Sequence, residues 1–142
     1  MPNWNRKEYS VNTLVGPGTT VKGVIESAGF TRIDGNVQGD VEAQGRVYIS
    51  EKARLKSSVR GTAITVGGVV SGDIVAKERV IILSSALILG DVITRRIQAD
   101  EGCLVHGRVR VCQNDEQWDQ AVAEQQDARR IKSVLSGHSK PG

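Results

Sequence analysis

The feature that most constrains this chain is an internal repeat. When residues 39–59 are aligned with residues 72–92, an offset of 33, eight of 21 positions are identical without a gap. Each unit divides again, because a five-residue motif recurs along the chain. It has an apolar residue at its first position, a small residue at its third and a second apolar residue at its fifth. The leading residues of this motif are Val21, Val37, Leu55, Val70, Ile88 and Val105. We therefore expect six turns of about seventeen residues, each depending on its neighbours for stability.

The pattern inside each turn predicts short β-strands. Apolar residues alternate with polar ones, as Val47 and Ile49 do around Tyr48, and alternation is typical of a half-buried strand. Most of these apolar residues are β-branched, which favours strands over helices. No helical periodicity is visible from residue 14 to residue 112, which excludes βαβ folds. Three short strands and tight corners per turn predict an all-β fold, a parallel β-helix of about six coils stacked about 4.8 Å apart.

The composition agrees with a narrow rod. Only five of the 142 residues are Trp, Tyr or Phe, so the core must consist of Val, Ile, Leu and Ala. No apolar run approaches the roughly 18 residues of a transmembrane helix, and the first ten residues do not resemble a secretory signal, so we expect a cytoplasmic protein. The net charge of +3 is too small and too spread to indicate a nucleic-acid partner.

No motif in the sequence indicates an enzyme, a cofactor or a metal. The glycine-rich start at residues 16–23 fails the phosphate-loop template, because Val24 stands where a lysine is required. His106 and His138 are the only histidines, too few for a three-histidine zinc site. Gly-Asp pairs place aspartates at Asp40, Asp73 and Asp91. These aspartates are either a carboxylate ladder for a cation or, as is more common, corner residues that accept backbone hydrogen bonds.

The repeated phrases resemble the bactofilins, a family of bacterial polymer-forming cytoskeletal proteins. The resemblance is clearest at residues 33–41, 70–76 and 88–92 and covers roughly residues 13–111. It implies a right-handed parallel β-helix between two short tails, and filaments made by end-to-end stacking without a nucleotide. It also implies three partners: further copies of this chain, lipid at the cytoplasmic face of the inner membrane, and cell-wall enzymes that the filament scaffolds in cell-shape control.

The two end coils are the predicted polymer contacts. Their strands lack a neighbour on one side, and an unpaired strand edge is a template for another chain. Bactofilins often carry an aromatic residue shortly before the glycine of the last coil, whereas Val105, two positions before Gly107, stands there in this chain. The predicted contacts are Val21 and Val24 in the first coil and Leu104, Val105, Val109 and Val111 in the last.

One stretch of the predicted rod is apolar on its outward face as well. Its outward residues are Ile81, Leu83, Leu87 and Leu89. A cluster of this kind marks a contact surface. Two interpretations remain: the patch binds another molecule, or the C-terminal tail covers it. The alternative function is that of an adaptor. In this interpretation the β-helix does not polymerise and binds a membrane or a cell-wall enzyme through the patch.

The predicted boundaries are a disordered tail over 1–12, a β-helix over 13–112 and a C-terminal tail over 113–142. In the first tail Trp4 and Tyr9 flank Arg6 and Lys7, a combination that favours an anionic membrane surface.

The C-terminal tail is predicted to contain a helix over 115–135, because this segment lacks Gly and Pro. Asn114 or Asp115 is the expected N-cap. The predicted apolar face of the helix includes Trp118, Ile131 and Leu135. We expect this face to dock on the outward patch, although Glu124 and Gln125 interrupt the apolar stripe.

Overall fold

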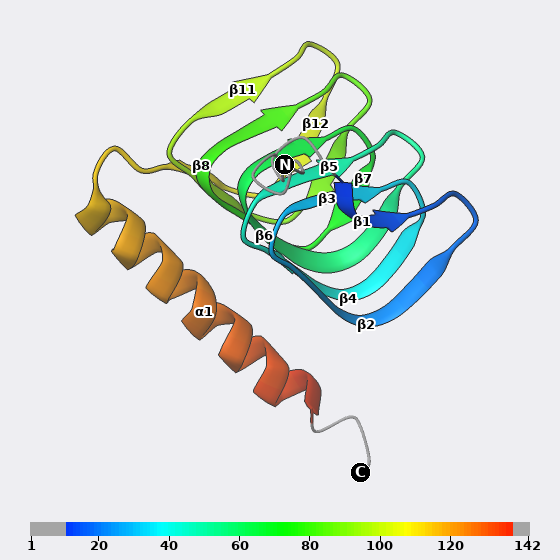
Figure 1. Ribbon diagram of the computed structural model, residues 1–142. Coiled ribbons are helices and arrows are strands. Elements are labelled where there is room, and N and C mark those ends of the chain that lie inside the picture. The colour runs from blue at the N-terminus through cyan, green and yellow to red at the C-terminus, as the bar shows by residue number, and fades with distance from the viewer. Residues whose placement is uncertain (1–10, 138–142) are drawn as a thin grey trace, which may run out of the picture.

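The computed structural model describes residues 11–137, and the side chains of residues 13–127. Thirteen strands wind into one rod of stacked coils, and a single helix lies along its outside (Figure 1). The strands are β1 (Val11–Val15), β2 (Thr20–Ser27), β3 (Phe30–Ile33), β4 (Asn36–Ala43), β5 (Arg46–Ile49), β6 (Arg54–Val66), β7 (Val69–Ser71), β8 (Ile74–Ile82), β9 (Leu87–Leu89), β10 (Val92–Thr94), β11 (Ile97–Ala99), β12 (Leu104–His106) and β13 (Val109–Val111). The helix is α1 (Asp115–Gly137).

The strands pair in parallel and stack into three faces. Face A contains β1, β3, β5, the ends of β6 and β8, and β11. Face B contains the starts of β2, β4 and β6, followed by β7, β9 and β12. Face C contains the ends of β2 and β4, the middle of β6, the start of β8, and then β10 and β13.

The strand register confirms the predicted parallel β-helix of six coils. On face B each leading residue of the repeat pairs with its equivalent in the next coil: Val21, Val37, Leu55, Val70, Ile88 and Val105. The rod begins at Val11, slightly before the predicted start at residue 13. Its first strand therefore includes two residues that were assigned to the N-terminal tail.

The inward side chains form one continuous aliphatic core. All members of the buried cluster are Val, Ile, Leu or Ala, and no aromatic ring is among them. Leu55, for example, is 1% exposed and lies between Val37 and Val70 of the neighbouring coils. Each buried side chain of this size contributes about 1.5–3 kcal/mol relative to exposure. Coils therefore stabilise one another through stacked pairs of equivalent residues.

The corners between faces A and B explain why the repeat spans two turns. Residues 16–19, 50–53, 83–86 and 100–103 form four-residue corners, whereas residues 34–35 and 67–68 form two-residue corners. Each long corner is closed by a backbone hydrogen bond of the β-turn type, such as Ala53 N–H to Ser50 C=O at 3.0 Å. Long and short corners alternate through the first five coils, so equivalent residues recur cleanly at every second turn.

The Gly-Asp corners between faces B and C join successive coils. The backbone N–H of Asp91 donates to Asp73 Oδ1 at 3.0 Å, and the N–H of Arg108 donates to Asp91 Oδ1 at 3.0 Å. These two aspartates are therefore corner residues that accept hydrogen bonds from the backbone of the following coil. Gly90 has a φ of 157°, and a Cβ atom there would lie 2.2 Å from the carbonyl oxygen of Gly72. Only glycine permits so close an approach of two backbones.

This packing predicts that Gly90→Ala destabilises the rod. The added methyl group must displace the backbone of the neighbouring coil, which costs about 2–4 kcal/mol. Thermal unfolding followed by circular dichroism measures the effect. Gly16→Ala is the matched control, because a Cβ atom at Gly16 has no neighbour within 4 Å. Equal unfolding midpoints for the two variants would contradict the assignment of Gly90 to a coil contact.

Candidate functional site: the ends and sides of the rod

Exposed aliphatic side chains gather at the two ends of the rod. Among the side chains described, the strongly exposed large hydrophobic residues are Leu14, Val24, Leu89, Leu104, Val109 and Val111. All except Leu89 belong to the first or the last coil. Strongly exposed aliphatic side chains are therefore concentrated in the two end coils.

The first coil is open on one side. Within residues 11–137, β1 pairs only with β3, and β2 pairs only with β4. Val24 on β2 is 61% exposed, while Val21 and Ile25 are half-buried against the end of the core. Leu14 on β1 is similarly exposed and was not among the predicted contacts. The apolar neighbours Leu14 and Val15 were the signal for it, because only one of two adjacent strand residues can face inward.

The last coil is open on the opposite side. Val109 and Val111 occupy inward positions and are 43% and 47% exposed, whereas their equivalents one coil earlier, Val92 and Thr94, are fully buried. Val105 is half-buried against the core. The inward residues of the last coil are thus exposed because no seventh coil covers them. Another rod stacked on this end would supply the missing cover.

The helix α1 docks on face C, which corrects the predicted docking site. Trp118, Ala121 and Val122 pack in a cluster with Val75 and Ile93, the outward residues of β8 and β10. None of the four residues of the predicted patch belongs to this cluster. Ile131 and Leu135 lie in α1, but their side chains are outside the described range. Figure 1 shows α1 outside the coils, along the side of the rod.

Polar contacts hold α1 in this position. Gln125 is 5% exposed; its side-chain amide donates to Asp73 Oδ2 at 3.2 Å, and its carbonyl oxygen accepts from Arg60 Nη2 at 3.2 Å. The Glu124 carboxylate accepts from Arg110 at 2.8 Å, and this hydrogen bond lowers the pKa of Glu124. Glu124 and Gln125, which interrupt the apolar stripe in the sequence, are therefore contacts in the docked helix.

The start of α1 is also anchored to the rod. Asp115 forms an ion pair with Arg95, which lowers the pKa of Asp115, and the Arg95 guanidinium lies 5.6 Å from the centre of the Trp118 ring. Asn114 is the N-cap, because its side-chain oxygen accepts from the Gln117 N–H at 2.8 Å.

The outward patch remains uncovered by α1. Ile81, Leu83 and Leu87 are half-buried, and Leu89 is 41% exposed. Leu87 pairs along face B with Leu104 of the last coil, so the patch continues to the end of the rod. The structure therefore brings the patch and the C-terminal end together, a continuity that the sequence analysis did not anticipate.

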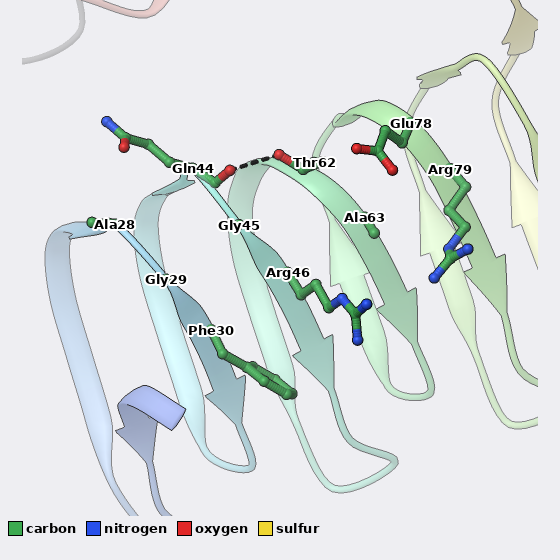
Figure 2. A pocket seen from close by; sticks show the side chains of 10 residues that line it. All are labelled: Ala28, Gly29, Phe30, Gln44, Gly45, Arg46, Thr62, Ala63, Glu78 and Arg79. Atoms are coloured by element: carbon green, nitrogen blue, oxygen red, sulfur yellow. Dashed lines mark hydrogen bonds between the residues drawn. The ribbon is translucent and has the colours of Figure 1, made fainter. Parts of the chain in front are cut away.

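A shallow groove of about 330 Å³ lies where the turns from face C meet face A (Figure 2). Phe30, Arg46, Glu78 and Arg79 line it, and the Thr62 hydroxyl donates to the Gln44 carbonyl oxygen at 2.6 Å beside it. This groove brings together no histidine, cysteine or paired carboxylates, so we assign it no catalytic chemistry. No group of three or more potential metal ligands occurs within the described part of the chain.

The predicted membrane contacts Trp4, Arg6, Lys7 and Tyr9 lie outside the described residues. Within the part that is described, no helix is long and apolar enough to span a bilayer.

These features define a class: a parallel β-helix rod whose sides are closed and whose ends are open and apolar. The family model described as "Bactofilin: Polymer-forming cytoskeletal" matches residues 13–110. This chain therefore belongs to the bactofilin family, whose members are polymer-forming cytoskeletal proteins.

Individual relatives agree with this assignment. Bactofilin BacO of Myxococcus xanthus is 24% identical over 108 residues, which cover 76% of this chain and 86% of BacO. Bactofilin BacP of the same organism is 28% identical over 98 residues, but this chain spans only 41% of its length. A solved structure titled "Cryo-EM reconstruction of Thermus thermophilus bactofilin double helical filaments" has a similar fold. Its TM-score is 0.63 at 24% identity, and the match covers 68% of this chain and 98% of that one.

The contacts of Gln125 predict that Gln125→Ala loosens α1. The substitution removes the hydrogen-bond partner of the half-buried Arg60 guanidinium and of Asp73 Oδ2, which costs about 1–3 kcal/mol. Hydrogen exchange of the α1 amides should accelerate by about tenfold or more. The neighbouring Gln126 is exposed, so Gln126→Ala is the control and should exchange like the wild type. Equal exchange in both variants would show that α1 is not held through Gln125.

Proposed function

We propose that this chain is a structural cytoskeletal protein that stacks end to end into filaments without a nucleotide and scaffolds cell-envelope machinery. The observation that carries the proposal is the exposure of inward residues at the ends. Val109 and Val111 have the side-chain positions of a core and lack only a following coil. Burying such surface is worth about 25 cal/mol per Å².

Backbone pairing supports stacking at the same ends. The outer edges of β1 and β2, and of β12 and β13, have no strand neighbour within residues 11–137. A second rod can continue the parallel or antiparallel ladder there, and the exposed inward residues Val109 and Val111 would be covered in the same step. Unpaired edges that coincide with apolar surface are the combination that strand-mediated assembly requires.

Nucleotide independence is supported by the corner at residues 16–19. The N–H of Thr19 donates to the carbonyl oxygen of Gly16 at 3.1 Å, which closes a turn between β1 and β2. A phosphate loop instead presents its free backbone N–H groups to the ligand. Assembly driven by open strand edges and apolar end residues needs no energy from hydrolysis.

A second candidate function is a non-polymerising adaptor that binds a membrane or a cell-wall enzyme. The exposed Leu89 and its half-buried neighbours on the outward patch favour it. The two candidates differ in one measurable property, since the adaptor stays a monomer.

The proposal predicts that Val109→Asp blocks filament growth. Val109 is an inward residue of the last coil, so an incoming rod would have to bury the carboxylate against the core, which is costly. The fold should tolerate the change, because Val109 is 43% exposed in the single rod. Light scattering and negative-stain microscopy without nucleotide should show assemblies no longer than two rods.

Ser58→Asp is the control for an added carboxylate, because Ser58 lies inside the stack and its outward row already carries Asp40. It should polymerise like the wild type. Long filaments of Val109→Asp, or a wild-type protein that stays monomeric at physiological salt, would contradict the proposed function.

We further propose that the N-terminal segment attaches the filament to anionic lipid at the cytoplasmic face of the inner membrane. Each of Arg6 and Lys7 adds about 1 kcal/mol near an anionic surface, and Trp4 and Tyr9 suit the lipid interface. Many copies along a filament add avidity.

Replacing Trp4 and Tyr9 by serine and Arg6 and Lys7 by glutamine should abolish flotation with anionic vesicles while leaving filaments intact. Phosphatidylcholine vesicles serve as the control for charge. Undiminished flotation of the fourfold variant would overturn the membrane assignment.

A further inference from the structure

Face A carries an excess of arginine on its outward surface. Two outward rows run along this face, and the strand register gives the order of their residues from coil to coil. The first row contains Phe30, Arg46, Ala63, Arg79 and Arg96, and the second contains Leu14, Arg32, Tyr48, Thr65, Ile81 and Gln98. Four of these eleven residues are arginine, and none is Asp or Glu. We call Arg46, Arg79 and Arg96 the arginine row.

The charge of the arginine row is not neutralised by a neighbouring carboxylate. Among the side chains of residues 13–127, the row forms no ion pair, and all three of its side chains are exposed. Arg79 and Arg96 lie in adjacent coils, about 4.8 Å apart in the direction of strand pairing, where like charges repel. By contrast, Arg95 and Arg110 form ion pairs with carboxylates of α1. Face A therefore presents positive charge that an anionic partner can neutralise.

A groove lies between two members of the arginine row. Ala63 separates Arg46 from Arg79, and its small side chain leaves space between the two guanidinium groups (Figure 2). The groove has a volume of about 330 Å³, and both Phe30 and Glu78 line it, with Glu78 at the corner that leads from face C. A guanidinium group donates paired N–H groups to phosphate oxygens. Two of them beside one groove are therefore suited to a phosphate group that lies between them.

We propose that face A binds the phosphate groups of anionic phospholipid, so that a filament lies with this face against the bilayer. This inference rests on the proposed function, because exposed ion pairs are individually weak and only a filament repeats the arginine row in every subunit. It adds a second membrane contact to that of the N-terminal segment, and it specifies which face of the rod meets the lipid.

The position of the N-terminal segment favours a bilayer as the occupant of face A. The strand β1 belongs to face A, and its first residue, Val11, pairs with Phe30 of the groove. Residues 1–10, which carry the proposed membrane contacts, therefore join the rod beside the groove. The helix α1 packs on Val75 and Ile93 of face C, so it does not stand between face A and a flat surface.

The aromatic residues of face A favour lipid over a nucleic acid. Proteins that bind single-stranded nucleic acid combine positive charge with aromatic rings on which the bases stack. The guanidinium group of Arg32 lies 5.2 Å from the centre of the Tyr48 ring, so a cation already occupies one face of this ring. Phe30 is half-buried at the groove. Face A is therefore better suited to phosphate groups alone than to phosphate groups and bases together.

The test neutralises two members of the arginine row in the full chain. Arg46→Gln with Arg79→Gln should leave the fold and the filaments intact, because both side chains are exposed and the row already accepts the neutral Ala63. Cosedimentation with vesicles of phosphatidylglycerol and phosphatidylcholine should show binding that is at least about tenfold weaker than that of the wild type. Arg46→Lys with Arg79→Lys keeps the charges and should bind within about threefold of the wild type.

Lys22→Gln with Lys56→Gln is the matched control. Lys22 and Lys56 also lie two coils apart in one outward row, with Gln38 between them, but they belong to face B. The control therefore removes the same charge at the same spacing from a different face. It should bind the vesicles like the wild type.

Two results would overturn the assignment of face A and leave the filament and its N-terminal attachment intact. One is unchanged vesicle binding by Arg46→Gln with Arg79→Gln, and the other is equal weakening by this variant and the control. A single-stranded DNA oligonucleotide that binds the wild type but not the arginine variant, with vesicle binding unchanged, would assign face A to nucleic acid and also overturn the inference. Negative-stain microscopy of the same samples tests the proposed function separately, because a wild type without filaments would contradict that function.

Discussion

The whole structure depends on the stacking of each coil on the equivalent residues of its neighbour. Leu55 is buried because Val37 lies on one side and Val70 on the other, and the same relation holds for each inward row. A solenoid of this kind has no separate core that could close its ends. The exposure of Val109 and Val111 is therefore a direct result of the architecture. Repeat proteins that stay monomeric cover such ends with capping elements, and within residues 11–137 neither end of this rod is covered.

The helix α1 covers face C of the rod and, in the described part of the chain, leaves face B and the two end coils without a helix. Because Val75 and Ile93 replace polar residues on face C, the helix binds along the side of the rod rather than across an end. Its contacts with Arg60, Asp73, Arg95 and Arg110 neutralise charges and bury a polar amide without covering a strand edge. Face C is thus occupied by α1, whereas the strand edges of both end coils have no strand neighbour within residues 11–137.

The sequence was sufficient to predict the coils and their register because side-chain alternation and the recurring glycine corners specify both. It did not indicate where α1 docks. Val75 and Ile93 each follow an inward residue, Ile74 and Val92, so the pairs resembled ordinary core positions. Gln125 is a buried polar residue whose partners come from distant coils, and no local pattern reveals such a contact. Leu14 lies inside the predicted β-helix but was missed, although the adjacent apolar residues Leu14 and Val15 of one strand signal that one of the two faces outward.

The central claim is that an open end of one rod is completed by the end of another, as if the coil continued. Cryo-electron microscopy of filaments grown without nucleotide tests this claim most directly. We predict strand spacing of about 4.8 Å that continues across each subunit junction, with a subunit length of about 29 Å along the axis. The inward residues Val109 and Val111 should be buried at the junctions. Filaments whose junctions are formed by the sides of the rods, with the end coils still exposed to solvent, would contradict the account.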